Sequence, residues 1–149
     1  MLSGRLVQTI ESHWEEIAGR LIQKIRRHPE TPVLAGRPEA EIREWCHAIL
    51  GNLGDWLGHG QESEVRRRYE ALGRDRFEEA IPLHEAVLRF YMLKEAVSDF
   101  VREYWVPVDS MQLYAGEEFD RRVSRFFDHL VYYVVRGYEE ARRRTARYA

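Results

Sequence analysis

The segment Leu72–Lys94, LGRDRFEEAIPLHEAVLRFYMLK, contains two helical patterns that are joined through a single proline. Proline suits the first turn of a helix, because its missing N–H would have no helical partner there and its fixed φ angle is already helical. We therefore expect one helix over about Ser63–Ala80 and a second from Pro82 to about Tyr104. The segment indicates an architecture and contains no catalytic motif.

The rest of the chain also repeats apolar residues in steps of three and four, without the alternation or the Asn-Gly and Asp-Gly turns that are typical of strands. A proline-rich connection is expected at 29–39, and further helices at about Gly4–Arg27, Glu39–Leu57 and Gly116–Arg144. A chain of 149 residues is long enough for one hydrophobic core. The prediction is a single all-α domain over residues 1–149, a bundle of about five main helices with a short flexible basic tail at about 142–149.

The composition is that of an ordinary globular protein, with 44% hydrophobic residues and a formal net charge of -2. This charge gives no bulk electrostatic reason to expect nucleic acid as a partner. Cys46 is the only cysteine, which excludes an intramolecular disulfide and favours a reducing cytoplasm. Acidic residues interrupt the N-terminus before a continuous apolar run develops, so neither a signal peptide nor membrane insertion is expected. Only two of the 23 basic residues are lysines, a bias typical of GC-rich bacterial genomes.

Motifs for catalysis or metal binding are incomplete. His84 and Glu85 begin like a zinc-protease helix, but Leu88 occupies the position of the second histidine. The glycine cluster at 51–60 lacks the Lys-Ser/Thr that completes a phosphate loop, and it is read as a helix end. Cys46 falls on an apolar helix stripe, where a small buried hydrophobe is expected instead of a nucleophile. The sequence therefore predicts no enzyme activity, no metal site and no cofactor.

Two cations fall on apolar helix stripes. Arg76 is in line with Tyr69 and Leu72, and Lys94 points among the apolar residues of the following helix, whose opposite arc holds Glu85, Arg89, Asp99 and Glu103. A cation in such a position needs a carboxylate or several carbonyl groups, or its stem reaches out to water. The sharper hypothesis is a pocket for an anionic or polar ligand. Its candidate lining residues are Arg76, Lys94, Tyr69 and Tyr91.

The last predicted helix is apolar over an unusually wide arc, because Val131, Tyr132 and Val135 extend its main stripe. A helix of this kind packs on two sides, so it is either central in the bundle or part of an interface. We expect a homodimer. The arginine groups at 66–68 and 142–147 are read as solvated helix surface and as a frayed terminus.

The residues of the opening segment carry a family resemblance. The charged helix at 72–80, the helix start Ile81-Pro82-Leu83-His84-Glu85 and the continuation through Val87, Leu88, Tyr91, Leu93 and Lys94 resemble the N-terminal sensor domain of RsbR-type stressosome co-antagonists. Trp14 with its flanking isoleucines, and the stretch from Phe127-Asp128-His129-Leu130 to Gly137-Tyr138-Glu139, are similar to the same family. This is the RsbRD N-terminal family, and the resemblance extends over about Leu6–Ala141.

The resemblance implies a globin-like helical domain, commonly dimeric, that takes part in signalling and the stress response. Such a domain senses a signal or docks a signalling protein without catalysis, and usually without haem. The family offers no settled ligand residues to transfer. Its members normally precede a STAS or kinase output domain, and no such domain is present in this sequence. The expectation is therefore a sensor or adaptor that acts on a separate partner.

Two alternatives stay open at this stage. A haem-binding globin would need an axial ligand aimed into an apolar pocket, but His84 lies about 80° from the Lys94 direction on a helical wheel. A visible absorption spectrum separates the two readings. A nucleic-acid or lipid adaptor that uses the C-terminal arginines predicts binding that weakens steeply with salt.

Overall fold

The computed structural model describes residues 2–58 and 60–147, and within them it contains eight helices and no strand. The all-α prediction is confirmed. The helices are α1 Leu2–Ser12, α2 Trp14–Arg27, α3 Pro32–Ala35, α4 Glu39–Leu50, α5 Leu53–Trp56, α6 Glu62–Glu78, α7 Leu83–Tyr104 and α8 Ser110–Arg147. The globin-like arrangement that the resemblance implies stays a prediction.

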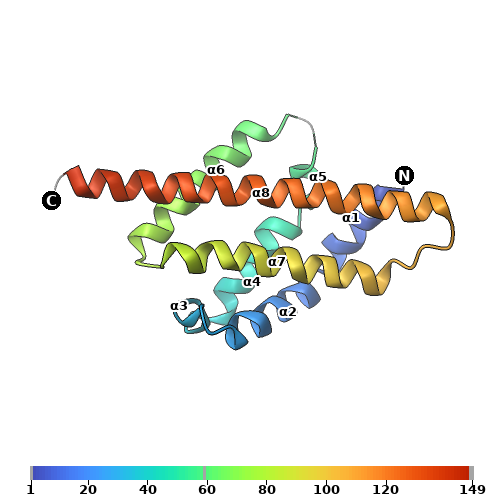
Figure 1. Cartoon of the computed structure of the whole chain (residues 1–149), viewed down its shortest axis with the longest axis horizontal. Coiled ribbons are helices and arrows are strands. Elements are labelled where there is room, and N and C mark those ends of the chain that lie inside the picture. Colours follow the sequence, from blue (N-terminus) through green and yellow to red (C-terminus); the bar gives the residue numbers. More distant parts are fainter. Residues whose placement is uncertain (1, 59, 148–149) are drawn as a thin grey trace.

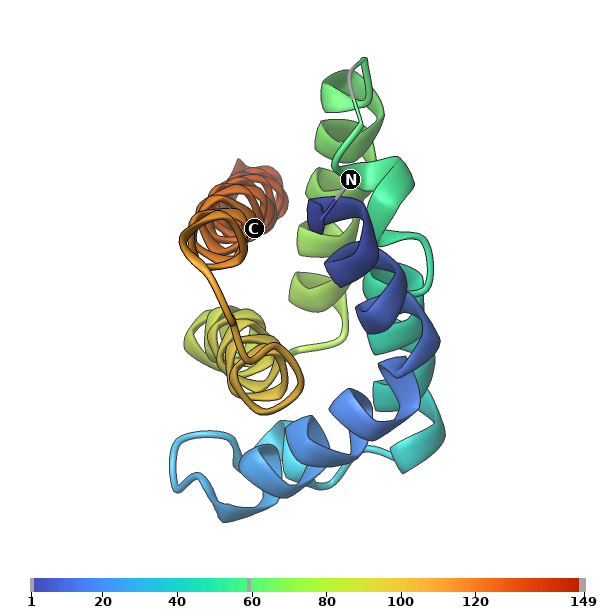
Figure 2. The same cartoon turned by 90° about the vertical axis from the view of Figure 1, so that its right-hand side faces the viewer.

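Two long helices, α7 and α8, form an antiparallel pair, in which α8 runs the length of the molecule and projects beyond α7 (Figure 1). Lys94 of α7 contacts Asp128 of α8, and Ser98 contacts Asp120, which fixes the antiparallel register. Figure 2 shows this pair end-on, with α1, α2, α4 and α6 curving around one side of it. The opposite side of the α7–α8 pair carries no other helix among the described residues.

The core lies between the long pair and the curved layer. Buried apolar side chains from all eight described helices form one continuous cluster, whose largest fully buried members are Phe90, Phe100, Phe119 and Phe127. Trp45 of α4 and Tyr69 of α6 meet Phe90 of α7 edge-on, with ring centroids 5.0 and 6.3 Å away. Edge-to-face packing of this kind stabilises aromatic clusters beyond the area that they bury.

Helices α6 and α8 cross with almost no side chains between their backbones. Gly73 of α6 lies against the carbonyl oxygen of Val134, and Gly137 of α8 lies against the carbonyl oxygen of Glu70. A Cβ atom at either position would overlap the facing backbone. The two glycines therefore set how closely these helices approach.

The turn between α6 and α7 is a Schellman motif. Ile81 N–H donates to the carbonyl of Arg76, and Ala80 N–H donates to that of Phe77, which satisfies the last carbonyls of α6. Ala80 adopts φ 59°, a left-handed conformation that usually belongs to glycine. Tyr138 of α8 donates its hydroxyl hydrogen to the carbonyl of Ile81, so the turn is also held from α8.

The observed helices differ from the expected ones at three breaks. The first predicted helix divides at His13, after Thr9 and Ser12 have bonded back to carbonyls one turn earlier, a pattern that bends helices. The second ends at Leu50, and α5 follows as a separate turn. The expected loop at 29–39 contains α3, because Pro32 occupies the first helical position.

The basic C-terminal segment belongs to α8 as far as Arg147. Arg143 and Arg144 lie near Glu139 and Glu140, one turn earlier on the same exposed surface. Residues 148 and 149 of the predicted flexible tail lie outside the described residues. No helix among the described residues is long and apolar enough to cross a membrane.

Cys46 should be unreactive in the native protein. Its side chain is fully buried on α4, and burial raises the pKa of the thiol to about 12. Since the thiolate is the reactive form, we expect negligible alkylation by iodoacetamide at pH 8 and complete alkylation in denaturant. Mass spectrometry of the treated protein measures both. Fast native labelling would contradict the burial of α4 in the core.

Candidate functional site

A cavity of about 280 Å³ opens between α4, the end of α6 and the start of α7. We call it the Arg89 cavity, after the charged lining residue that is buried. Its walls combine three arginines and three glutamates with four apolar residues. The lining residues are Arg37, Glu41, Ile42, Glu44, Trp45, Ala48, Arg76, Glu79, Ile81 and Arg89.

Arg89 is a buried cation on α7. Only 4% of the residue is exposed, and its guanidinium carbon lies 3.9 Å from the centre of the Trp45 ring. Within the described residues it makes no ion pair, and its Nε and Nη2 atoms have no hydrogen-bond partner. Loss of water around the group, followed by the positive charge of Arg76, lowers the pKa of Arg89 to about 9. Trp45 thus offers a favourable cation–π contact but no neutralising charge.

Arg76 and Arg37 lie at the outer part of the cavity and share one carboxylate. Arg76 donates to both oxygens of Glu79, at 2.8 and 2.7 Å, and Arg37 donates to the same carboxylate. Arg37 also lies 3.2 Å from Glu41. The charges at the mouth are therefore matched, whereas the charge of Arg89 further inside is not.

Glu85 is the nearest acidic residue to Arg89 along α7, one turn earlier, and it is also buried. It does not pair with Arg89 within the described residues. Its Oε1 accepts a hydrogen bond of 3.0 Å from the backbone N–H of Leu34 in α3. Glu85 therefore anchors the proline-rich connection on α7, and its charge is directed away from the cavity.

The four candidate residues from the sequence fall on two sides of α7. Arg76 lines the Arg89 cavity, and Tyr69 is buried behind it against Phe90, where burial raises the pKa of the phenol to about 12. Lys94 and Tyr91 lie on the other side, where Lys94 contacts Asp128 at 3.7 Å and Tyr91 is 48% exposed. Of the four, Arg76 alone lines the Arg89 cavity, whereas Tyr69 belongs to the hydrophobic core. Lys94 and Tyr91 lie on the uncovered face of the α7–α8 pair.

The charged arc opposite Lys94 is expected to face water, but Glu85 and Arg89 on that arc are buried, because α3 and α4 cover this side of α7. A second stripe carried the missed signal. Ala86, Leu93, Ala96 and Phe100 recur in steps that place Arg89 in register with them. The stripe contains two alanines, whose small side chains make it less evident than the larger apolar side chains of the neighbouring arc.

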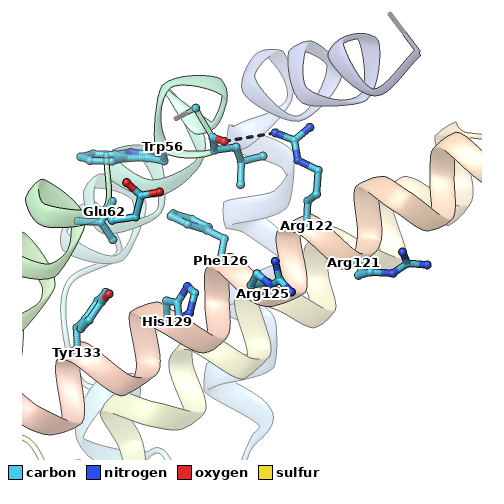
Figure 3. A pocket seen from close by; sticks show the side chains of 11 residues that line it. Trp56, Glu62, Arg121, Arg122, Arg125, Phe126, His129 and Tyr133 are labelled. Carbon is cyan, nitrogen blue, oxygen red and sulfur yellow. Dashed lines mark hydrogen bonds between the residues drawn. The ribbon is translucent and has the colours of Figure 1, made fainter. Parts of the chain in front are cut away.

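A second cavity, of about 480 Å³, lies between the α5–α6 connection and α8. Figure 3 shows Trp56 and Glu62 on one wall, and Arg125, Phe126 and His129 of α8 on the other. Arg122 donates to the carbonyl of Leu57 across this gap, at 3.3 Å. The cavity is cationic and aromatic, but its arginines are exposed and already in contact with water.

Metal binding has no obvious location in the described part of the chain. Among residues 2–58 and 60–147, no group of three or more His, Cys, Asp and Glu side chains is placed to hold an ion.

Comparison with protein families identifies one match. The model of the RsbT co-antagonist protein RsbRD N-terminal domain matches residues 15–149, which include every residue of both cavities. Curated proteins and solved structures gave no match. The family resemblance predicted from the sequence is confirmed: the chain belongs to the RsbRD N-terminal domain family.

Proposed function

We propose that the chain is a non-catalytic signalling domain that acts by binding, as a homodimer that docks a signalling protein and takes a small ligand at the Arg89 cavity. Membership of the RsbRD N-terminal family supports a stressosome-type sensor role. The proposal assigns the domain to the bacterial cytoplasm and its stress response. Its single cysteine, Cys46, suits a reducing compartment.

The observation that carries the proposal is the uncovered face of the α7–α8 pair (Figure 2). Tyr91 of α7 and Tyr132 of α8 are 48% and 53% exposed there, beside the partly buried Val131. The ion pair of Lys94 and Asp128 lies on the same face. Two such faces can meet about a twofold axis, because each offers the aromatic rings, the cation and the carboxylate that the other can contact.

Tyr132→Glu is expected to weaken self-association at least about tenfold, since it places a desolvated charge in the proposed interface. Sedimentation equilibrium of the wild type and the variant measures the dissociation constant. The matched comparison is Met111→Glu, which introduces the same charge at an exposed apolar position on the same helix.

Met111 belongs to a second exposed apolar surface, at the α7–α8 connection. Its exposed members include Tyr104, Val106, Val108, Leu113 and Tyr114. Dissociation by Met111→Glu with no effect of Tyr132→Glu would move the interface to this end of the molecule. A wild type that stays monomeric at high protein concentration would remove the homodimer from the proposal.

A further inference from the structure

The unpartnered buried side-chain atoms of the described residues share two properties. They are Trp45 Nε1, Arg76 Nε, Arg89 Nε and Arg89 Nη2, and all four are nitrogen donors. All three residues line the Arg89 cavity. Buried donors normally have acceptors, so their concentration in one cavity indicates an occupant that supplies acceptors.

The occupant must also carry negative charge. Water could accept hydrogen bonds from these donors, but it would not compensate the buried guanidinium of Arg89. Two of the three lining carboxylates are already engaged: Glu79 accepts from Arg76 and Arg37, and Glu41 contacts Arg37. The third, Glu44, is exposed and makes no ion pair with Arg89 among the described residues. Arg89 is the cation in this group without a carboxylate among the described residues.

The geometry of Arg89 narrows the class of anion. Nε and Nη2 carry parallel N–H bonds along one edge of the planar guanidinium, and that edge matches two oxygens of a carboxylate or a phosphate. A spherical anion can meet this edge only at one point. The indole N–H of Trp45 and the Nε–H of Arg76 add further donors for the remaining oxygens.

The volume limits the size of the occupant. A cavity of about 280 Å³ is too small for a nucleotide or a haem and large enough for a small oxyanion with a few waters. Arg76 lies at the outer part of the cavity, with its side chain 14% exposed.

We infer that the Arg89 cavity is a binding site for a small oxyanion, a phosphate or a short carboxylate, held by Arg89 with Trp45 and Arg76. This inference rests on the proposed function only where it takes the anion as the signal. The binding itself is inferred from the unpartnered donors in the cavity. Because Arg76 and Glu79 lie at the Schellman turn, an anion that takes Arg76 away from Glu79 changes the contacts of the α6–α7 joint.

The test is isothermal titration calorimetry of the full chain in Tris chloride, with inorganic phosphate and sodium acetate as separate probes. Acetamide, which has the shape of acetate and no charge, is the control ligand. We expect saturable binding of at least one anion, binding at least about tenfold weaker in Arg89→Met, and unchanged binding in Arg102→Met, an exposed arginine on the same helix. Phosphate binding without acetate binding assigns a phosphate site, and the reverse assigns a carboxylate site.

Three results would overturn the inference: no binding of either anion to the wild type, equal binding to Arg89→Met, or binding of acetamide as tight as that of acetate. Circular dichroism of Arg89→Met verifies that the variant is folded, and Arg89→Lys, which keeps the charge but loses the paired edge, should bind more weakly than wild type. Sedimentation of the same samples separates the two ideas. If the protein is a dimer but binds no oxyanion, only the ligand site is contradicted. If it binds an oxyanion as a monomer, only the homodimer is contradicted.

Discussion

Gly137→Ala should lower the free energy of unfolding by about 3 kcal/mol, at the upper end of what overpacking costs. The new methyl group would overlap the carbonyl of Glu70, and backbone at that position cannot rotate away as a side chain could. Gly73→Ala should have a similar effect through the carbonyl of Val134. Urea unfolding followed by far-ultraviolet circular dichroism measures both.

The same substitution at Gly19 is the matched control. Gly19 lies within α2, and a Cβ atom there would have no neighbour within 4 Å. Alanine is the better helix former, so Gly19→Ala should raise stability by about 0.5–1 kcal/mol. The double variant of Gly73 and Gly137 should lose less than the sum of the two single losses, since both separate the same helices. Neutral single variants would contradict the close crossing of α6 and α8.

Arg89→Met should raise the free energy of unfolding by about 1–3 kcal/mol in Tris chloride, because it removes a buried charged group whose donors are unsatisfied. Methionine has a similar length and can keep its contact with the Trp45 ring. The sign of this change shows whether Arg89 is paired, since the removal of one partner from a buried ion pair is normally strongly destabilising. Urea unfolding in a buffer free of phosphate and carboxylate measures the change.

Arg102→Met on the exposed side of the same helix should change stability by less than about 0.5 kcal/mol. Destabilisation by Arg89→Met would show that Arg89 has an acceptor that neutralises it in the free protein. If an oxyanion fills the cavity, a saturating concentration of that anion should stabilise the wild type and leave Arg89→Met unaffected. The difference in free energy of unfolding between the two proteins should then become smaller or change sign.

Helical periodicity predicted the all-α fold and the joint at Pro82, because both depend on local spacing and on the chemistry of one residue type. The separation of α1 from α2 depends on how Thr9 and Ser12 bond to the backbone, which composition does not reveal. The family was recognisable from the segment around Pro82. These elements needed no knowledge of tertiary contacts.

The cation at the centre of the candidate site was harder to predict. Arg76 was identified because it interrupts a stripe of large apolar residues, while Arg89 follows Glu85 by one turn and looks like half of a surface ion pair. Only the packing of α4 and α3 onto α7 shows that Glu85 bonds to Leu34 instead. Lys94 and Tyr91 were grouped with Arg76 by helix direction, but direction alone does not say which neighbours cover a face.

The close contact at Gly73 and Gly137 holds α6 against α8 at one point along its length. Its first turn borders the second cavity and its last turn borders the Arg89 cavity, and α8 passes between these ends (Figure 1). Any tilt of α6 about Gly73 must move the two ends in opposite directions. Such a tilt therefore changes the shape of both cavities at once, although no side chain is common to both.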